Sequence, residues 1–190
     1  MRWLSLYARS RQAPASAAVV LLVVLAGWAF DHDGPGPMGL GTAVLVLTVS
    51  VAAASVGLGG QDAALDRTAA IRWVPRRAAH LLLIGAFAAA ALLALRLVGA
   101  EPAPTGYVVR DAAGLAGLAG LGAVLCGAHL AWILPTGWLA VTVLSPAAPG
   151  TVGEVVHWMT FSPVTTVSTG TGWVLLAVGT ALYAVVGPRR

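Results

Sequence analysis

The chain has 190 residues, of which 58% are hydrophobic and 9% are charged, with a formal net charge of +4 and a mean hydropathy of +0.86. This composition excludes a soluble globular protein, and apolar segments occupy so much of the length that a soluble catalytic domain is excluded too. The sequence therefore predicts an all-α integral membrane protein, with residues 1–190 as a single transmembrane domain.

Six apolar segments are long enough to cross a bilayer, because a hydrocarbon layer of about 30 Å requires roughly 20 residues. Before the first segment, residues 1–14 mix arginines with aromatic and aliphatic side chains, which is typical of an interfacial helix in the headgroup layer. A disordered basic tail is the alternative for these residues. The predicted spans lie near residues 15–30, 38–58, 79–99, 108–126, 129–147 and 170–187.

Residues 60–78 join the second and third predicted spans and carry most of the charge in the middle of the chain. Four arginines and two aspartates alternate there with apolar side chains, in a segment that must lie outside the hydrocarbon layer. Two interpretations fit this pattern. It is either a docking surface for a cytoplasmic motor protein or a juxtamembrane helix whose arginines bind anionic headgroups.

Residues 111–148 are almost continuously apolar and too long for one crossing, so we expect a tight turn at residues 126–129 and a kink at Pro135 in the helix that follows. A four-span topology with a long buried segment is the alternative. Small residues recur at spacings of three and four in the first half, which favours close packing inside a bundle or at a dimer seam. The residues predicted to pack in this way are Ala112, Ala116, Gly117 and Gly120.

Residues 149–165 are too polar to cross a membrane and too apolar for an ordinary exposed loop. They predict a short re-entrant or interfacial helix before the last span. Glu154 and His157 lie three residues apart and share one face of that helix. This pair is either an outer gate that contacts a substrate or two interfacial side chains that reach water.

The charges also predict an orientation. All eleven basic residues are arginines, and with six spans nine of them lie on one face of the membrane. The opposite face carries Arg96 and Arg110 together with five of the seven acids. By the positive-inside rule the arginine-rich face is cytoplasmic, so the sequence predicts a multi-pass protein of the cell membrane with both termini in the cytoplasm.

No motif predicts an active site, a metal site or a nucleic-acid site. The sequence contains no Walker, HExxH or GxSxG motif, and its single cysteine, Cys126, excludes an internal disulfide. Two classes other than a transporter stay open. One is a lipid-modifying enzyme that uses His80 and His129 with Asp62 or Asp66, and the other is a non-catalytic membrane scaffold or regulatory subunit.

Four short motifs stand out: residues 65–70 (LDRTAA), 73–77 (WVPRR), 80–82 (HLL) and 187–190 (GPRR). In these the chain resembles small membrane proteins of high-GC actinobacteria that accompany an ATP-binding-cassette subunit, and those proteins are similar to compact permeases of the type-two exporter superfamily. The resemblance implies six spans after an interfacial helix. It also implies a coupling helix between spans two and three and a re-entrant element between spans five and six.

The resemblance further implies the function of a permease subunit in an exporter. A cytoplasmic ATPase subunit would bind ATP and Mg²⁺, this chain would bind no cofactor, and a second permease half would complete the path as a homodimer or with a related protein. Contact with membrane lipid is expected, and contact with nucleic acid is not. The residues implied in coupling to the ATPase are Asp66, Arg67, Arg72, Trp73, Pro75, Arg76 and Arg77.

Overall fold

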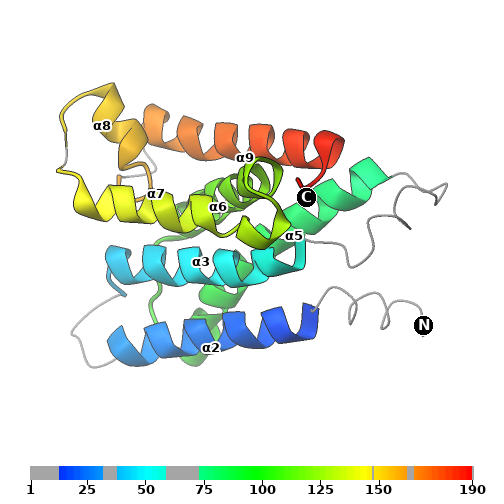
Figure 1. Cartoon of the computed structure of the whole chain (residues 1–190). Helices are drawn as coiled ribbons and strands as arrows, with labels where there is room; N and C mark the ends of the chain where they lie inside the picture. Colours follow the sequence, from blue (N-terminus) through cyan, green and yellow to red (C-terminus); the bar gives the residue numbers. More distant parts are fainter. Residues whose placement is uncertain (1–12, 32–37, 59–72, 147, 162–164, 190) are drawn as a thin grey trace.

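Long runs of alanine, leucine and valine give this chain its helices, because a backbone in lipid must satisfy its own hydrogen bonds. The computed structural model describes residues 13–31, 38–58, 73–146, 148–161 and 165–189. Within these ranges every regular element is helical (Figure 1). The all-α fold predicted from composition is therefore confirmed.

Five helical units are long and apolar enough to cross a membrane. Many of their large apolar side chains face outward, among them Leu22, Phe30 (94% exposed) and Val185. A surface of this kind is solvated by lipid rather than water, and the chain is a multi-pass helical membrane protein. The five units are α2 (Ala13–Asp31), α3 (Leu40–Ser55) with η1 (Val56–Leu58), α5 (Trp73–Leu93) with η2 (Ala94–Val98), α6 (Thr105–Leu125) and α9 (Thr166–Val186).

Three shorter elements lie between α6 and α9, namely η3 (Ala128–Leu130), α7 (Ile133–Leu144) and α8 (Thr151–Val156). The turn expected at residues 126–129 falls between α6 and η3, where Gly127 has a φ of +100° that favours glycine. The 12 residues of α7 rise about 18 Å, which is less than the hydrocarbon thickness of about 30 Å. Five of the six predicted spans are thus supported by length and composition, and the remaining one, residues 129–147, stays a prediction.

The kink predicted at Pro135 stays a prediction. Pro135 lies in the first turn of α7, which begins at Ile133 and follows η3 in one apolar helical stretch, Ala128–Leu144. The first backbone N–H groups of a helix have no intrahelical acceptor, and a proline there removes no hydrogen bond. Pro135 therefore lies close to the change from η3 to α7 within that stretch.

α6 lies at the centre of the bundle and packs against α3, α5, α7 and α9. On one side a Cβ at Gly85 of α5 would lie 3.0 Å from Ala116 Cβ and 3.1 Å from the carbonyl oxygen of Ala112. On another side a side chain at Gly117 or Gly120 would overlap the backbone of α9. The four small residues singled out in the sequence therefore lie inside the bundle, where they let α6 approach its neighbours closely.

The two ends of the bundle differ in charge. At one end the Tyr183 hydroxyl donates to the carbonyl oxygen of Leu58 at 2.9 Å, and at the other the Met38 N–H donates to the carbonyl oxygen of Glu101 at 2.8 Å. Figure 1 shows α8 at the second of these ends. The end with the Tyr183 hydrogen bond is called the basic end, because its charged side chains among the described residues are Arg76, Arg77 and Arg189. The end with α8 is called the acidic end, and its described charged side chains are Asp31, Glu101, Asp111 and Glu154 with Arg96 and Arg110.

Candidate functional site at the acidic end

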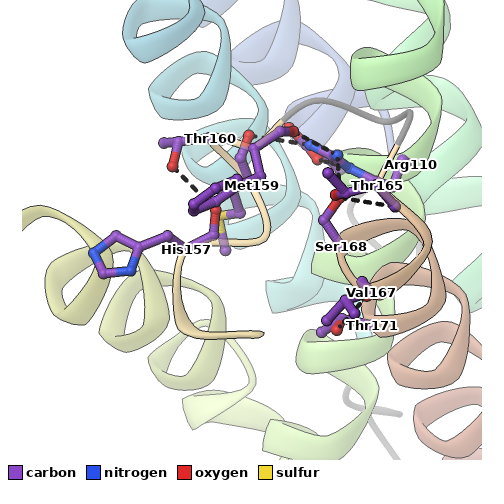
Figure 2. A network of polar contacts seen from close by, with 10 residues as sticks. Arg110, His157, Met159, Thr160, Thr165, Val167, Ser168 and Thr171 are labelled. Carbon is purple, nitrogen blue, oxygen red and sulfur yellow. Dashed lines mark hydrogen bonds and ion pairs between the residues drawn. The ribbon is translucent and has the colours of Figure 1, made fainter. Parts of the chain in front are cut away.

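Arg110 lies in the second turn of α6, and its side chain is 2% exposed. Its Nε donates to Oδ1 of the adjacent Asp111 at 2.8 Å. Its Nη1 donates to the carbonyl oxygen of Phe161 at 2.7 Å and to Oγ of Ser168 at 3.2 Å, and its Nη2 donates to the carbonyl oxygen of Met159 at 3.2 Å (Figure 2). These five residues, which we call the Arg110 clamp, join α6 to α9 and to the segment that follows α8.

Aromatic rings lie close to the guanidinium. Arg110 Cζ lies 5.0 Å from the ring centroid of Tyr107 and 5.8 Å from that of Trp158, both within the range of a cation–π interaction. Trp158 is fully buried, and a side chain at Gly114 would overlap its ring. The chain beyond α8 thus folds into the bundle, with Trp158 and Met159 as its buried anchors.

Asp111 supplies the counter-charge for Arg110 and is itself 1% exposed. The two form an ion pair with 2.8 Å between Nε and Oδ1, the one ion pair found in the described parts of the chain. Burying a single charge in a low-dielectric interior costs several kcal/mol. The pairing and the three further hydrogen bonds of Arg110 offset that penalty.

This arrangement holds structure together rather than performing chemistry. A guanidinium has five N–H donors and does not release a proton in proteins. Four hydrogen bonds engage the clamp arginine, through Nε, through Nη1 twice and through Nη2 once. Arg110 therefore acts as a fixed fork that binds Met159, Phe161 and Ser168 to α6.

The predicted gate residues Glu154 and His157 face different surroundings. His157 is buried, and its ring points away from Arg110 (Figure 2). Its Nε2 lies 3.2 Å from the carbonyl oxygen of Ser145, and its Nδ1 lies 3.2 Å from that of Gly153. Glu154 is half-buried. In the described part of the chain, His157 therefore ties α8 to the end of α7 rather than pairing with Glu154.

The residues implied in coupling divide into two groups. The structure places four of them in the first turns of α5, namely Trp73, Pro75, Arg76 and Arg77. α5 continues from there without a break as a membrane-spanning helix. The others lie outside the described residues: Asp66, Arg67 and Arg72. The predicted coupling segment, residues 60–78, therefore ends inside α5. Of the other predicted segments, residues 1–12 and 162–164 also lie outside the described ranges.

The histidines of the lipid-enzyme alternative both lie toward the basic end. His80 lines an apolar groove beside α2 and α3, whereas His129 is exposed in η3. Asp62 and Asp66, their predicted acidic partners, fall outside the described residues. The geometry thus gives this alternative no assembled set of polar groups in the part of the chain that the structure describes.

Sequence reasoning missed the Arg110 clamp. It placed Arg110 and Asp111 on the outer face only as topology signals, whereas the structure buries both side chains inside the bundle. The available signal was an adjacent pair of opposite charges at the start of an apolar run, because ionisable residues within a span face the protein interior.

Comparisons of the chain with protein-family models, with curated proteins and with solved structures find no match. The functional interpretation therefore depends on the residues and contacts described above.

Proposed function

We propose that this chain is the membrane-spanning permease subunit of an ATP-binding-cassette exporter. A separate cytoplasmic ATPase binds ATP and Mg²⁺, and a second permease half, either a second copy or a related protein, pairs with this chain. The basic end faces the cytoplasm, so both termini lie on that side of the cell membrane. Cargo crosses between the two halves, which is consistent with the close packing of α6 inside a single bundle.

The proposal depends mainly on how the segment between α3 and α5 is anchored. This segment, residues 59–72, connects Leu58 to Trp73. Leu58 accepts the hydrogen bond of Tyr183, and the Arg77 guanidinium lies so close to Gly187 that a Cβ there would come within 2.7 Å of Nη1. Both anchor points therefore contact the end of α9. A force that a motor protein applied to the segment would reach α3, α5 and α9 together.

The path of the chain supports six crossings. At the basic end, just before η3, the Arg189 N–H donates to the carbonyl oxygen of Ala123 at 2.9 Å. At the acidic end, just after α7, Ser145 contacts His157. η3 and α7 together thus lead from one end of the bundle to the other, which can be followed in Figure 1. In the proposal they form the fifth span, and α8 with the buried residues after it forms a re-entrant element before the sixth.

The Arg110 clamp has a defined role in this proposal. It holds the re-entrant element against α6 and so keeps the outer end of the permease half closed. Opening that end requires the segment around Met159 and Phe161 to leave Arg110, which breaks hydrogen bonds to two backbone carbonyls. ATP-driven movement of the helices would have to supply this free energy through the anchored segment.

Affinity purification of the tagged protein from its native membrane in mild detergent tests the proposal. We expect an ATP-binding-cassette ATPase to co-purify in near-stoichiometric amount. Arg67→Glu combined with Arg76→Glu should abolish stimulated ATP turnover while leaving membrane insertion intact. The control Arg96→Glu makes one such charge reversal in an exposed side chain at the acidic end and should leave turnover unchanged. Recovery of the chain without an ATPase would contradict the proposal.

One observation favours the second candidate, a non-catalytic scaffold or regulatory subunit. Gly117 of α6 and Gly179 of α9 approach so closely that a side chain on either would overlap the backbone of the other helix. A central pair packed in this way suits a rigid support. This candidate predicts that the same purification recovers a stable membrane complex whose composition and activity do not respond to ATP.

A further inference from the structure

An apolar groove runs along one side of the basic end, between α2, the end of α3 and α5. It has a volume of about 300 Å³ and is lined by Ala17, Gly57, His80, Leu83 and Phe87, among others. This volume lies at the lower end of the range for ligand sites. Leu83 is 65% exposed and Phe87 is 40% exposed, so the groove opens sideways, toward the surrounding lipid.

One face of α5 gives the groove a polar entrance and an apolar floor. Arg76, His80, Leu83 and Phe87 follow one another at spacings of four, three and four, which places them on one face of the helix. Arg76 lies one turn beyond His80, toward water, and its Cζ lies 6.0 Å from the ring centroid of Trp73. A tryptophan beside an arginine is typical of the headgroup layer of a membrane.

The length of this face matches one leaflet of a bilayer. From Arg76 to Phe87 the helix advances eleven steps and rises about 16.5 Å, and half of the hydrocarbon thickness is about 15 Å. A charged group held at Arg76 would therefore lie at the surface while a chain attached to it followed the groove toward the midplane. This is the shape of a phospholipid rather than that of a free anion or a polar solute.

The positive charge of the basic end favours a lipid with an anionic headgroup. Among the described residues the basic end carries Arg76, Arg77 and Arg189, while all four described acids lie at the acidic end. We propose that the apolar groove between α2, α3 and α5 binds one anionic phospholipid, with its phosphate on Arg76 and one acyl chain along Leu83 and Phe87. The bound lipid would fill the space between α2 and α5. It would thereby stabilise the contact between α2 and α5.

Native mass spectrometry of the purified full chain tests this site, with phosphatidylglycerol and phosphatidylcholine of identical acyl chains as probes. We expect one phosphatidylglycerol molecule to be retained preferentially. Arg76→Gln should weaken its retention by about fivefold, the expected effect of one arginine at an anionic surface. Arg96→Gln, an exposed arginine at the acidic end, is the matched control and should retain the lipid as the wild type does.

A second variant separates the chain site from the charge site. Ala17→Phe adds a ring to the groove wall and should weaken retention of both lipids, whereas Arg76→Lys should keep the preference for phosphatidylglycerol. Circular dichroism of each variant checks that the helices have formed. Equal retention of the two lipids by the wild type would overturn the proposal, as would wild-type retention by Arg76→Gln. Full displacement of the lipid by inorganic phosphate would assign the site to a free anion, and a lipid-free dimer covering the groove would assign it to a second copy.

Discussion

The side chain of Arg110 crosses the backbone of α9 at Gly172. A Cβ at residue 172 would lie 2.9 Å from Arg110 Cγ and 3.2 Å from the Arg110 carbonyl oxygen. The stem of the arginine thus occupies the place that a side chain at residue 172 would need. The reach of the guanidinium toward Met159, Phe161 and Ser168 depends on the absence of that side chain.

Gly172→Ala should therefore destabilise the protein through overpacking. The added methyl group forces Arg110 or α9 to shift, and overpacking of this kind costs about 1–3 kcal/mol. Gly170→Ala is the matched control, because a Cβ at Gly170 meets nothing within 4 Å. Equilibrium unfolding of both variants in mixed micelles measures the difference, and equal stability of the two would show that Arg110 does not constrain residue 172.

Removing the clamp arginine alone should lower the free energy of unfolding more than removing both members of the ion pair. Arg110→Met leaves the buried Asp111 without its counter-charge, and breaking a buried pair in this way costs about 3–5 kcal/mol. The double variant Arg110→Met with Asp111→Leu removes both charges and should recover much of that loss.

The same unfolding measurement distinguishes the two clamp variants. Limited proteolysis within residues 157–161 should also become faster in Arg110→Met than in the wild type, because that segment loses two of its hydrogen bonds to α6. A double variant as unstable as the single one would mean that the hydrogen bonds, rather than the unpaired charge, account for the loss.

The sequence predicts the helices of this protein better than it predicts their contacts. Runs of about 20 apolar residues indicate spans whatever surrounds them, and the glycines and alanines of α6 indicate close packing. The partners of Arg110 leave no such pattern, because two of them are backbone carbonyls roughly fifty residues away. Pro135 is ambiguous in the sequence for a similar reason, since one proline fits either a kink or a helix start, and its place in the first turn of α7 depends on the fold.

Tyr183→Phe should weaken the anchor at the basic end. The change removes one hydroxyl and leaves the carbonyl oxygen of the fully buried Leu58 without its donor, which costs about 1–3 kcal/mol. Tyr107→Phe is the control, because it keeps the ring that Arg110 contacts, and it should change stability little. In a complex purified with an ATPase, Tyr183→Phe should also reduce stimulated ATP turnover without releasing the ATPase. Unaltered turnover would mean that force does not pass through the contact between η1 and α9.

The single cysteine provides a direct test of orientation. Cys126 is exposed directly after α6, at the basic end. If that end is cytoplasmic, a membrane-permeant maleimide should label Cys126 in intact cells, whereas an impermeant maleimide should label it only after the cells are opened. The reciprocal variant, Glu101→Cys in a Cys126→Ser background, places the thiol at the acidic end and should react with the impermeant reagent at once. Reaction of Cys126 with the impermeant reagent in intact cells would place the basic end on the external face. A cytoplasmic ATPase could then not dock on that end, which would contradict the proposed function.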